Sequence, residues 1–434
     1  MSRENRKKQR RRKKVIMRRR ILLLIFLLVL IPLIYKGTSL LVRGSKSLYS
    51  SISDRREDKE SEKKPGKETI PIKDKDKEQA EDKEKEKPAE AEKANAKILS
   101  VGDVMFHMPQ VKSAYIGDGN YDFADSFKYV KNHIEAADVS IANFESVTAG
   151  NDKRFSGFPQ FNSPKETLLG LKESGFDIVS TANNHSLDQG KEGILKTLEY
   201  AKSYGLKTIG TYKEKQTEYL IEEKNGIKLG FLAYTYGVNG LEFYLSPEEL
   251  STMVNIIDET KIKRDIEALK KQADIVVVSV HWGTEYQRET GQQQIDLGHK
   301  MVDWGANVIL GSHPHVLQKS EIIKKDGMDN FIIYSMGNFF SNQRQETMGN
   351  SFTEDGVMVE IDIEKDIAND KTWVKSVNFL PTWIDKYNED GRDIYRILST
   401  RDVLEGKLDI QLSDKIKARI EKSQRDSLEI LNYQ

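Results

Sequence analysis

Hydrophobic positions divide the chain into three stretches of different character. An unbroken apolar run, residues 21–35, follows a polar head, and a highly charged stretch with few apolar positions comes next. From residue 97 onwards, short apolar runs alternate with segments whose apolar positions recur every three or four residues. Short apolar runs are typical of buried strands, and the longer spacing is typical of amphipathic helices. The third stretch is therefore expected to be a globular α/β body.

Within this body, the pattern predicts alternating strands and helices. The expected helices cover residues 123–137, 165–174, 190–204, 261–272 and 292–304. The expected strands cover residues 98–101, 139–142, 178–181, 219–222, 228–234, 275–280, 308–310, 331–334 and 356–363, with a further one at 373–380. Such alternation predicts one large α/β domain with a mixed sheet over residues 97–385. The charged, periodic tail, residues 386–434, is expected to be a helical C-terminal appendage.

The apolar run near the N-terminus predicts a membrane anchor. Extended over residues 21–42 it would form a helix of roughly 33 Å, enough for a hydrocarbon core of about 30 Å. A cleaved signal peptide is the alternative, but no cleavage site of the Ala-x-Ala kind follows. The basic segment 1–20 would remain in the cytoplasm by the positive-inside rule. We expect a single-pass protein of the cell membrane, with a cytoplasmic N-terminus and an extracellular main domain.

Charge is distributed unevenly along the chain. The 434 residues contain 68 Lys and Arg against 68 Asp and Glu, but residues 1–20 carry twelve basic residues and one Glu, a local charge of +11. A DNA-binding arm is the other interpretation of this basic segment. Its last arginines adjoin the apolar run, which favours a role at the membrane. We therefore expect no nucleic-acid partner. In residues 54–93, 28 of 40 residues are charged, too many to bury the surface that would offset chain entropy. Residues 43–96 are expected to form a charged, disordered linker.

Chemically capable side chains follow five of the expected strands. Asp103 follows the strand at 98–101 and Glu145 follows the one at 139–142. The other three strands end in these residues: Asn183, Asn184 and His185; His281; His313 and His315. Because the carboxyl ends of strands in α/β sheets gather around a ligand crevice, these side chains are expected to converge. The chain has no cysteine, which excludes thiolate ligands and a Cys nucleophile.

Imidazole, carboxylate and amide groups together suit first-row divalent ions. Six residues are candidate ligands: Asp103, Glu145, Asn184, His281, His313 and His315. Six ligands are too many for one tetrahedral ion and suit two ions (Mn, Zn or Fe) that share a bridging group. His313 and His315 are expected to project to one side, as alternate residues of an extended segment do. Any one of these histidines could instead be structural, and His107 is open between ligand, support and substrate contact.

Six motifs in this chain resemble, in order and spacing, the CapA family of bacterial capsule-biosynthesis proteins associated with poly-γ-glutamate. The motifs, spread over residues 97–385, are Gly102-Asp103-Val-Met, Ala142-Asn143-Phe-Glu145-Ser, Ala182-Asn183-Asn184-His185-Ser-Leu-Asp188, Val280-His281-Trp282-Gly283, Gly311-Ser-His313-Pro-His315 and Tyr334-Ser-Met-Gly337-Asn338-Phe. The resemblance implies a four-layer α/β/β/α sandwich of the calcineurin-like metallophosphoesterase type, with the six candidate ligands as a dinuclear metal set.

The resemblance also implies roles for residues around the metal set. His185 resembles a general acid or a stabiliser of the leaving group, and Asp188 would orient it. Residues expected to contact substrate or to support the ligands are His107, Asn143, Asn183, Glu285 and Asn338.

The chain departs from the phosphoesterase pattern at three motifs. Three residues, 104–106, separate Asp103 from His107, where that pattern has one. Asn143 and Glu145 stand where it has Gly-Asp, and Ser312 interrupts its Gly-His-x-His. The number and identity of the metals and any phosphatase activity are therefore open.

Three functions are compatible with these observations. The first is a membrane-anchored protein for assembly, export or retention of poly-γ-glutamate or another anionic surface polymer. The second is an extracellular metal-dependent hydrolase of γ-glutamyl or phosphoester bonds, and the third is a non-catalytic partner of membrane polymer-synthase subunits. Because the chain beyond residue 20 carries −11, a polyanion would be repelled unless metal ions and loop cations such as Lys153, Arg154 and Arg344 offset that charge.

Overall fold

The computed structural model of the protein describes residues 92–431, which fall within one unit, residues 86–434. The predicted basic segment 1–20, the anchor 21–42 and the linker up to residue 91 lie outside the described residues. Among residues 92–431, no helix combines the length and apolar character needed to span a bilayer.

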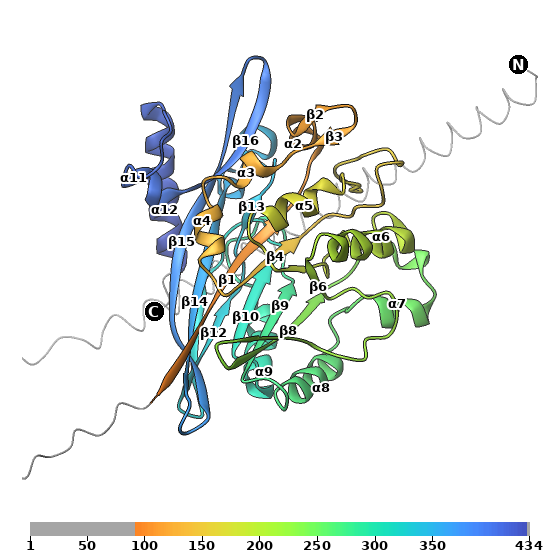
Figure 1. Ribbon diagram of the computed structural model, residues 1–434, viewed down its shortest axis with the longest axis vertical. Helices are drawn as coiled ribbons and strands as arrows, with labels where there is room; N and C mark the ends of the chain where they lie inside the picture. The colour runs from red at the N-terminus through yellow and green to blue at the C-terminus, as the bar shows by residue number, and fades with distance from the viewer. Residues whose placement is uncertain (1–91, 432–434) are drawn as a thin grey trace, which may run out of the picture. The chain divides into compact units, whose positions relative to one another are not determined.

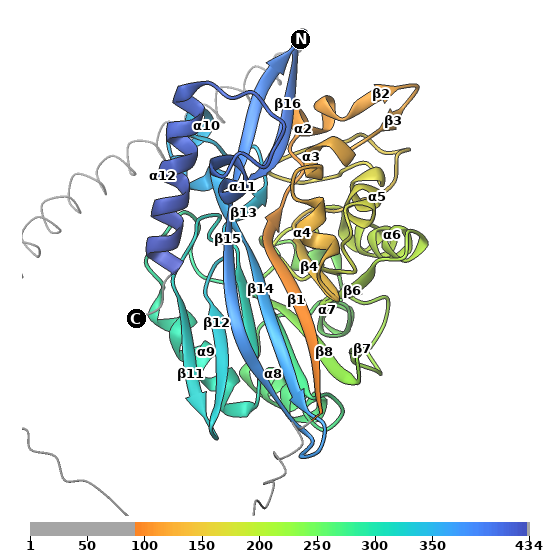
Figure 2. The same ribbon diagram turned by 60° about the vertical axis from the view of Figure 1, so that its left-hand side comes forward.

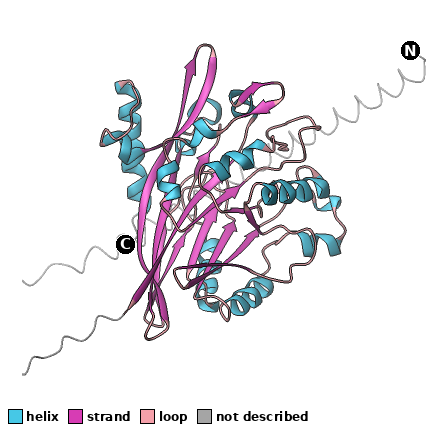
Figure 3. Ribbon diagram, viewed as in Figure 1, coloured by secondary structure: helices cyan, strands magenta, loops and turns pink. Residues whose placement is uncertain are grey.

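Two mixed β-sheets form the centre of the described unit (Figures 1 and 3). The eight-stranded sheet contains, in spatial order, β16 (Arg392–Ser399), β15 (Lys371–Glu389), β14 (Asp355–Asp366), β1 (Lys93–Val104), β4 (Val139–Phe144), β5 (Ile178–Ser180) and β6 (Lys207–Ile209), with β13 (Asn338–Phe340) paired to β1. The six-stranded sheet contains β11 (Ser320–Lys325), β12 (Met328–Ile333), β10 (Val308–Ser312), β9 (Ile275–His281), β8 (Ile227–Thr235) and β7 (Leu220–Lys224). Strands β1, β4, β5 and β6 are parallel to one another, as are β8, β9, β10 and β12.

Helices and short elements surround the sheets. The helices are α2 (Met108–Ser113), α3 (Ala124–Phe127), α4 (Lys131–Glu135), α5 (Glu166–Glu173), α6 (Gly190–Ser203), α7 (Pro247–Met253), α8 (Glu259–Leu269), α9 (Gln292–Trp304), α10 (Gln345–Met348), α11 (Thr400–Leu404) and α12 (Asp414–Leu431). The 3-10 helices are η2 (Glu242–Tyr244) and η3 (Ser351–Glu354), and β2 (Tyr115–Gly117) and β3 (Asn120–Tyr121) form a small hairpin.

Three clusters of buried apolar side chains fill the spaces between the layers, and their packing explains why the strands are apolar. Ile98 and Val277, one from each sheet, lie in the cluster between the sheets. Leu99 packs toward the helices on the outer face of the eight-stranded sheet, and Val276 packs toward α8 and α9. Successive strand residues point to opposite faces, so a strand buried on both faces needs an unbroken apolar run. The result is the expected order of layers: helices, sheet, sheet, helices.

The structure corrects both predicted boundaries of the domain. β1 begins at Lys93, within the segment expected to be linker. β15 runs through the predicted boundary at residue 385 to Glu389, and β16 then adds an antiparallel edge strand. The tail is thus part sheet and part helix rather than a helical appendage, because Tyr395, Ile397 and Leu398 are buried in the core of the domain.

The single helix expected over residues 123–137 is also wrong. The structure has two short helices, α3 and α4, joined by a turn. The backbone at this turn forms bonds between residues three apart, Val130 N to Phe127 O and His133 N to Val130 O. Phe127, Val130 and Ile134 are all buried against the eight-stranded sheet, so packing of these side chains overrides the helical periodicity.

The last helix, α12, closes one side of the sandwich. It lies alongside β15, and its last residue reaches the start of β11, as Figure 2 shows. Leu431 is fully buried in the cluster between the sheets, and its carbonyl accepts a bond from Ser320 Oγ at 2.6 Å. Higher on the helix, Arg419 and Ser423 both bind Asp355 at the start of β14. The C-terminal helix is therefore an integral part of the core.

Candidate metal centre

The predicted site residues converge where parallel strands of both sheets end. Asp103 is the next-to-last residue of β1, and Glu145 directly follows β4. Asn183 and Asn184 lie shortly after β5, and His281 is the last residue of β9. The carboxyl ends of parallel strands form one edge of each sheet, so polar residues that follow apolar strands meet at that edge. This part of the sequence-based expectation is confirmed.

Two glycines allow the strands to approach closely at this edge. A Cβ atom on Gly102 would lie 2.0 Å from the carbonyl oxygen of Gly337, and one on Gly311 would lie 2.0 Å from that of Tyr334. Only a residue without a side chain fits such contacts. The first contact fixes β1 against β13 and thereby places Asp103, whose backbone N donates to Gly337 O at 3.0 Å.

The conformation of the His-Pro-His segment differs from the prediction. β10 ends at Ser312, and the next histidines are not extended: φ is 100° at His313 and 58° at His315. Residues other than glycine rarely adopt positive φ, and such strain is concentrated at functional sites. The two imidazoles reach the site through a strained turn, which apolar patterning does not reveal.

Glu145 is the central group of the site. Its Oε1 atom lies 3.5 Å from Nε2 of His281 and 3.8 Å from Nε2 of His315. Among the described residues, three groups of side chains have ligand atoms within 4.8 Å of one another: Glu145, His281 and His313; Asp103, Glu145 and His315; and Glu285, His313 and His315. Glu145 belongs to two of these groups, so its carboxylate lies where the two groups meet.

The donor set fits a divalent cation. Glu145 is completely buried, yet neither of its carboxylate oxygens has a hydrogen-bond partner within residues 92–431, and His313 Nδ1 also has none. Buried polar atoms almost always have partners, because an unsatisfied one costs free energy. Burial, followed by the negative charge of Asp103, raises the pKa of Glu145 well above its ordinary value. A bound cation would satisfy these orphaned atoms and hold the carboxylate ionised.

Two of the candidate histidines, His281 and His313, are in the protonation state that a metal ligand requires. Burial lowers the pKa of His313 to about 3 and that of His281 well below its ordinary value, with neighbouring histidines adding to both shifts. At neutral pH both imidazoles are therefore uncharged and have a free lone pair. The sequence indicated the residue types, but the burial that sets the charge state comes from the fold.

Asparagine side chains support the candidate ligands. Asn184 Oδ1 lies 3.0 Å from His281 Nε2, on the edge of the ring that faces Glu145. Asn143 Nδ2 donates to Asp103 Oδ1 at 2.8 Å, and Asn338 Oδ1 lies 3.1 Å from His315 Nδ1. Asn183 Nδ2 donates to Phe144 O at 2.8 Å. Such contacts orient ligands, and Asn184 and Asn338 each present an oxygen to a ring nitrogen of a candidate ligand.

His185 and Asp188 form a buried pair at the side of the centre. His185 Nδ1 lies 2.7 Å from Asp188 Oδ2, which also accepts from the backbone N of Phe161 at 2.7 Å. The other ring nitrogen, Nε2, lies 4.0 Å from Glu145 Oε1 and thus faces the centre. A carboxylate on Nδ1 fixes the tautomer and leaves Nε2 to exchange a proton with a bound molecule.

Two further predicted residues lie at the periphery. His107 is half-buried, and its Nδ1 accepts from the backbone N of Asn342 at 3.3 Å. Burial lowers the pKa of His107 to about 4, so the ring is neutral. Glu285 is exposed but lies within reach of His313 and His315. His107 therefore stands outside the three ligand groups, whereas Glu285 belongs to one.

Aromatic residues around the centre were not anticipated. The ring of Tyr236 lies 4.6 Å from His313, and that of Tyr286 lies 5.9 Å from His315. Phe161 contacts His185 edge-on at 4.8 Å between centroids. Tyr236 directly follows Thr235, the last residue of β8, so the same strand-end reasoning that identified the ligands applies to it.

The loop cations expected near the site differ in their surroundings. Lys153 pairs with Glu192 at 2.5 Å, and Arg344 is buried, with its guanidinium 3.5 Å from Glu354. Arg154 is exposed, and no carboxylate within residues 92–431 lies within 4.0 Å of it. Of the three, Arg154 alone retains a charge that is not neutralised by a described carboxylate.

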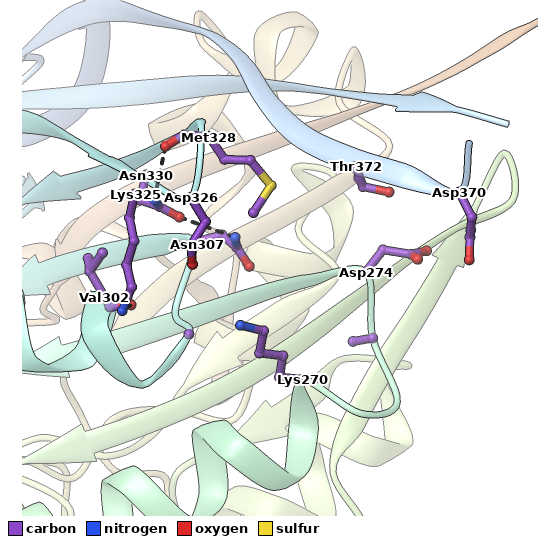
Figure 4. Close-up of a pocket in the computed structure, with 12 residues that line it drawn as sticks. Lys270, Asp274, Val302, Asn307, Lys325, Asp326, Met328, Asn330, Asp370 and Thr372 are labelled. Carbon is purple, nitrogen blue, oxygen red and sulfur yellow. Dashed lines mark hydrogen bonds between the residues drawn. The ribbon is translucent and has the colours of Figure 1, made fainter. Parts of the chain in front are cut away.

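A pocket of about 220 Å³ lies at the other end of the six-stranded sheet, where β9 and β10 begin (Figure 4). It contains basic side chains, Lys270 and Lys325, and the acidic side chains of Asp274, Asp326 and Asp370. Lys325 is bound to Asp303 at 3.1 Å. Its mixed charges and its distance along the strands from the carboxyl ends separate this pocket from the metal centre.

Comparisons with known proteins place this geometry in context. Residues 97–343 match the family described as "Bacterial capsule synthesis protein PGA_cap". The chain is 32% identical over 320 residues to the "PGA biosynthesis protein CapA" of Bacillus subtilis, covering 68% of this chain and 79% of that protein. It is 31% identical over 270 residues to the "Capsule biosynthesis protein CapA" of Bacillus anthracis, covering 60% of this chain and 62% of the relative. A solved phosphatase from Mycoplasma pneumoniae superposes with a TM-score of 0.37 and 17% identity, over 66% of this chain and 93% of that one.

Proposed function

The chain belongs to the bacterial capsule synthesis protein family PGA_cap, and from this premise we propose that it acts in assembly, export or retention of poly-γ-glutamate at the cell surface. The name of the Bacillus subtilis relative supports the polymer, and that of the Bacillus anthracis relative supports a part in capsule synthesis. The basic segment, apolar run and charged stretch of residues 1–96 support placement on the outer face of the membrane. Membrane synthase subunits that make the polymer are the partners that this placement favours.

The site has a specific part in this proposal. The observation that carries it is Glu145, a fully buried carboxylate without a hydrogen-bond partner in residues 92–431, with His281, a neutral imidazole, 3.5 Å away. We assign Asp103, Glu145, Asn184, His281, His313 and His315 to two divalent ions, Mn, Zn or Fe, in a fold of the metallophosphoesterase type. When bound, such ions activate water and stabilise negative charge on a reacting oxygen.

A second candidate function, hydrolysis of γ-glutamyl or phosphoester bonds, is favoured by the His185–Asp188 pair. Asp188 holds His185 at Nδ1, and Nε2 points toward the centre. A protonated Nε2 would donate its proton to the leaving group of a bond held there, and Asp188 would stabilise the positive charge that the ring carries before the transfer. A capsule protein that cuts the polymer during release or attachment would combine both functions.

Complementation of a deletion in a strain that produces poly-γ-glutamate tests the proposal. Loss of surface polymer on deletion, and its return with the wild-type gene, is the expected result; an unchanged capsule would refute the proposal. Complementation with His281→Ala tests the metal centre, and complementation with a chain that lacks residues 1–42 tests the anchor.

These two variants separate catalytic from scaffolding action. If the His281→Ala chain restores the capsule fully while the anchorless chain does not, the protein serves as a non-catalytic partner of the synthase. If both fail, the centre is required. Turnover of the polymer by the purified protein with Mn or Zn, lost in His185→Ala, would establish hydrolysis.

A further inference from the structure

A second pocket opens beside His107 and the His185–Asp188 pair. It has a volume of about 620 Å³, and the loop of residues 154–160 forms one wall, with α2 opposite. The side chains used below are Met108, Lys112, Arg154, Phe155, Phe158 and Gln189. None of the described residues that line this pocket is acidic.

Its positive charge is not neutralised by neighbouring carboxylates. Lys112 and Arg154 are both exposed, and neither has a carboxylate within 4.0 Å in residues 92–431. In the pocket that borders Tyr236 and Trp282, by contrast, Lys300 is paired with Glu259 at 2.9 Å. The pocket beside His107 therefore carries two available cations in a protein whose chain beyond residue 20 is acidic.

One aromatic ring separates this pocket from the proton-transfer pair. Phe161 lies 5.3 Å from the ring of His107 and 4.8 Å from that of His185. Gln189 lines the pocket, directly follows Asp188, and donates to Phe161 O at 3.0 Å. These contacts place the pocket on the side of the metal centre occupied by His185.

The lining is suited to a carboxylate on an aliphatic chain. Met108, Phe155 and Phe158 supply apolar surface for methylene groups, and Phe158 is 72% exposed although it is a large apolar residue. A guanidinium can bind a carboxylate through two parallel hydrogen bonds, and an ammonium adds a point charge.

We propose that the pocket lined by Lys112 and Arg154 is an anion subsite that binds a carboxylate of an acidic polymer, on the side of the metal centre occupied by His185. This inference rests on the proposed function and adds a determinant of specificity to it. The metal centre would act on a bond of the polymer, and the subsite would select a polymer with carboxylate side groups. It also explains how an acidic protein can hold a polyanion locally.

Binding of a defined γ-linked glutamate oligomer to the full-length protein, at fixed Mn concentration, tests the subsite. The comparison ligand is the same oligomer with its carboxylates converted to neutral amides. We expect the wild-type protein to prefer the acidic oligomer, and the double variant Lys112→Ala/Arg154→Ala to bind it about tenfold or more weakly, with a smaller salt dependence. Binding of the amide oligomer should not change.

Two control variants accompany this measurement. Lys112→Arg/Arg154→Lys keeps both charges and should retain at least part of the preference for the acidic oligomer. Lys415→Ala/Lys417→Ala removes two exposed lysines of α12, which likewise have no carboxylate within 4.0 Å among the described residues, and should bind as the wild type does. All four positions are exposed, so melting temperatures close to the wild-type value will show that the variants fold.

The outcomes separate the subsite from the proposed function. If the wild type binds the acidic oligomer and the double alanine variant binds it equally well, the subsite is wrong and the proposed function stands. If the wild type does not distinguish acidic from amide oligomer, both are refuted. If a glycerol-phosphate polymer binds more tightly than the glutamate oligomer and depends on the same pair, the assignment to a carboxylate is wrong.

Discussion

Replacement of Glu145 by glutamine should make the metal-free protein more stable than the metal-free wild type. With metal bound, the wild type should be the more stable of the two. The substitution keeps the shape of the side chain and removes the carboxylate at the centre of the site. Glu145 is fully buried, neither of its oxygens has a partner, and burial raises its pKa. In the metal-free protein this group is therefore a source of instability.

The size of the effect follows from the unpaired atoms. A buried polar group without a partner costs about 1–3 kcal/mol and more when it is charged, so a neutral amide costs less in this site than an ionised carboxylate. Without metal, Glu145→Gln should thus raise the free energy of unfolding by about 1–3 kcal/mol. With metal at a thousandfold excess over its Kd, the wild type gains about 4 kcal/mol, which the variant loses in large part.

Thermal and denaturant unfolding, each with a chelator and with Mn or Zn, measures the reversal. The matched control is Glu354→Gln, a second buried glutamate. Its oxygens do have partners, since Gln345 N donates at 3.0 Å and Trp383 Nε1 at 3.2 Å, and Arg419 lies 3.3 Å away. This control should lose about 1.5–3 kcal/mol in either condition, because it weakens hydrogen bonds to a charged group.

A metal-free Glu145→Gln protein that is less stable than the metal-free wild type would refute this account of Glu145. That outcome would mean that protein groups stabilise the carboxylate of Glu145 in solution when no cation is bound. Equal stabilisation of wild type and variant by metal would show that the ions bind elsewhere.

Three other predictions concern the same region. Metal binding should release a proton from Glu145 and weaken as pH falls through the raised pKa of this group, because the ion must displace that proton. Calorimetry in buffers of different ionisation enthalpy measures the proton release, and Glu145→Gln should abolish it. If the protein hydrolyses its polymer, Asp188→Asn should lower kcat at least about tenfold with little change in metal content, since Asp188 sets the tautomer of His185; metal analysis and kinetics decide this. Gly102→Ala should destabilise the protein by more than about 3 kcal/mol and reduce metal binding, because its Cβ would meet Gly337 O at 2.0 Å; an unfolding curve close to that of the wild type would contradict the close approach.

The hydrophobic pattern predicted an α/β domain and the edge of the sheets at which the site lies, whereas the order of the layers was implied by the family resemblance. Strands such as β9 are uninterrupted apolar runs because both faces are buried, and the polar residue that ends each one lies at the common edge. Asp103, Glu145 and His281 could be found in this way without any knowledge of side-chain conformation. Tyr236 could have been found by the same rule, which had been applied only to acids, amides and histidines.

Other features depended on contacts that local patterning does not encode. The break between α3 and α4 reflects packing of Phe127 and Val130, and the strand β16 exists because β15 offers an edge to pair with. The positive φ angles at His313 and His315 are imposed by the surrounding structure. Lys153 and Arg344 could not be distinguished from Arg154, because their partners Glu192 and Glu354 are distant in the sequence or buried.

A series of hydrogen bonds links the C-terminal helix α12 to the candidate ligands. Arg419 binds Asp355 and the carbonyl of Ser351, while Thr353 O, in the same 3-10 helix, accepts from Asn338, which contacts His315. Loss of α12 should therefore affect the geometry of the centre as well as stability.

The candidate ligands come from strand ends that are spread between Asp103 and His315, with Asn338 and α12 bracing them from further along the chain. A ribosome must therefore have released nearly the whole domain before any two-ion site can exist, and a partly made chain offers an ion only isolated side chains. Metal loading would then follow folding and would draw on whichever pool surrounds the finished domain. The identity of the ion in the cell would be decided by the compartment in which the chain folds as much as by the residues that bind it.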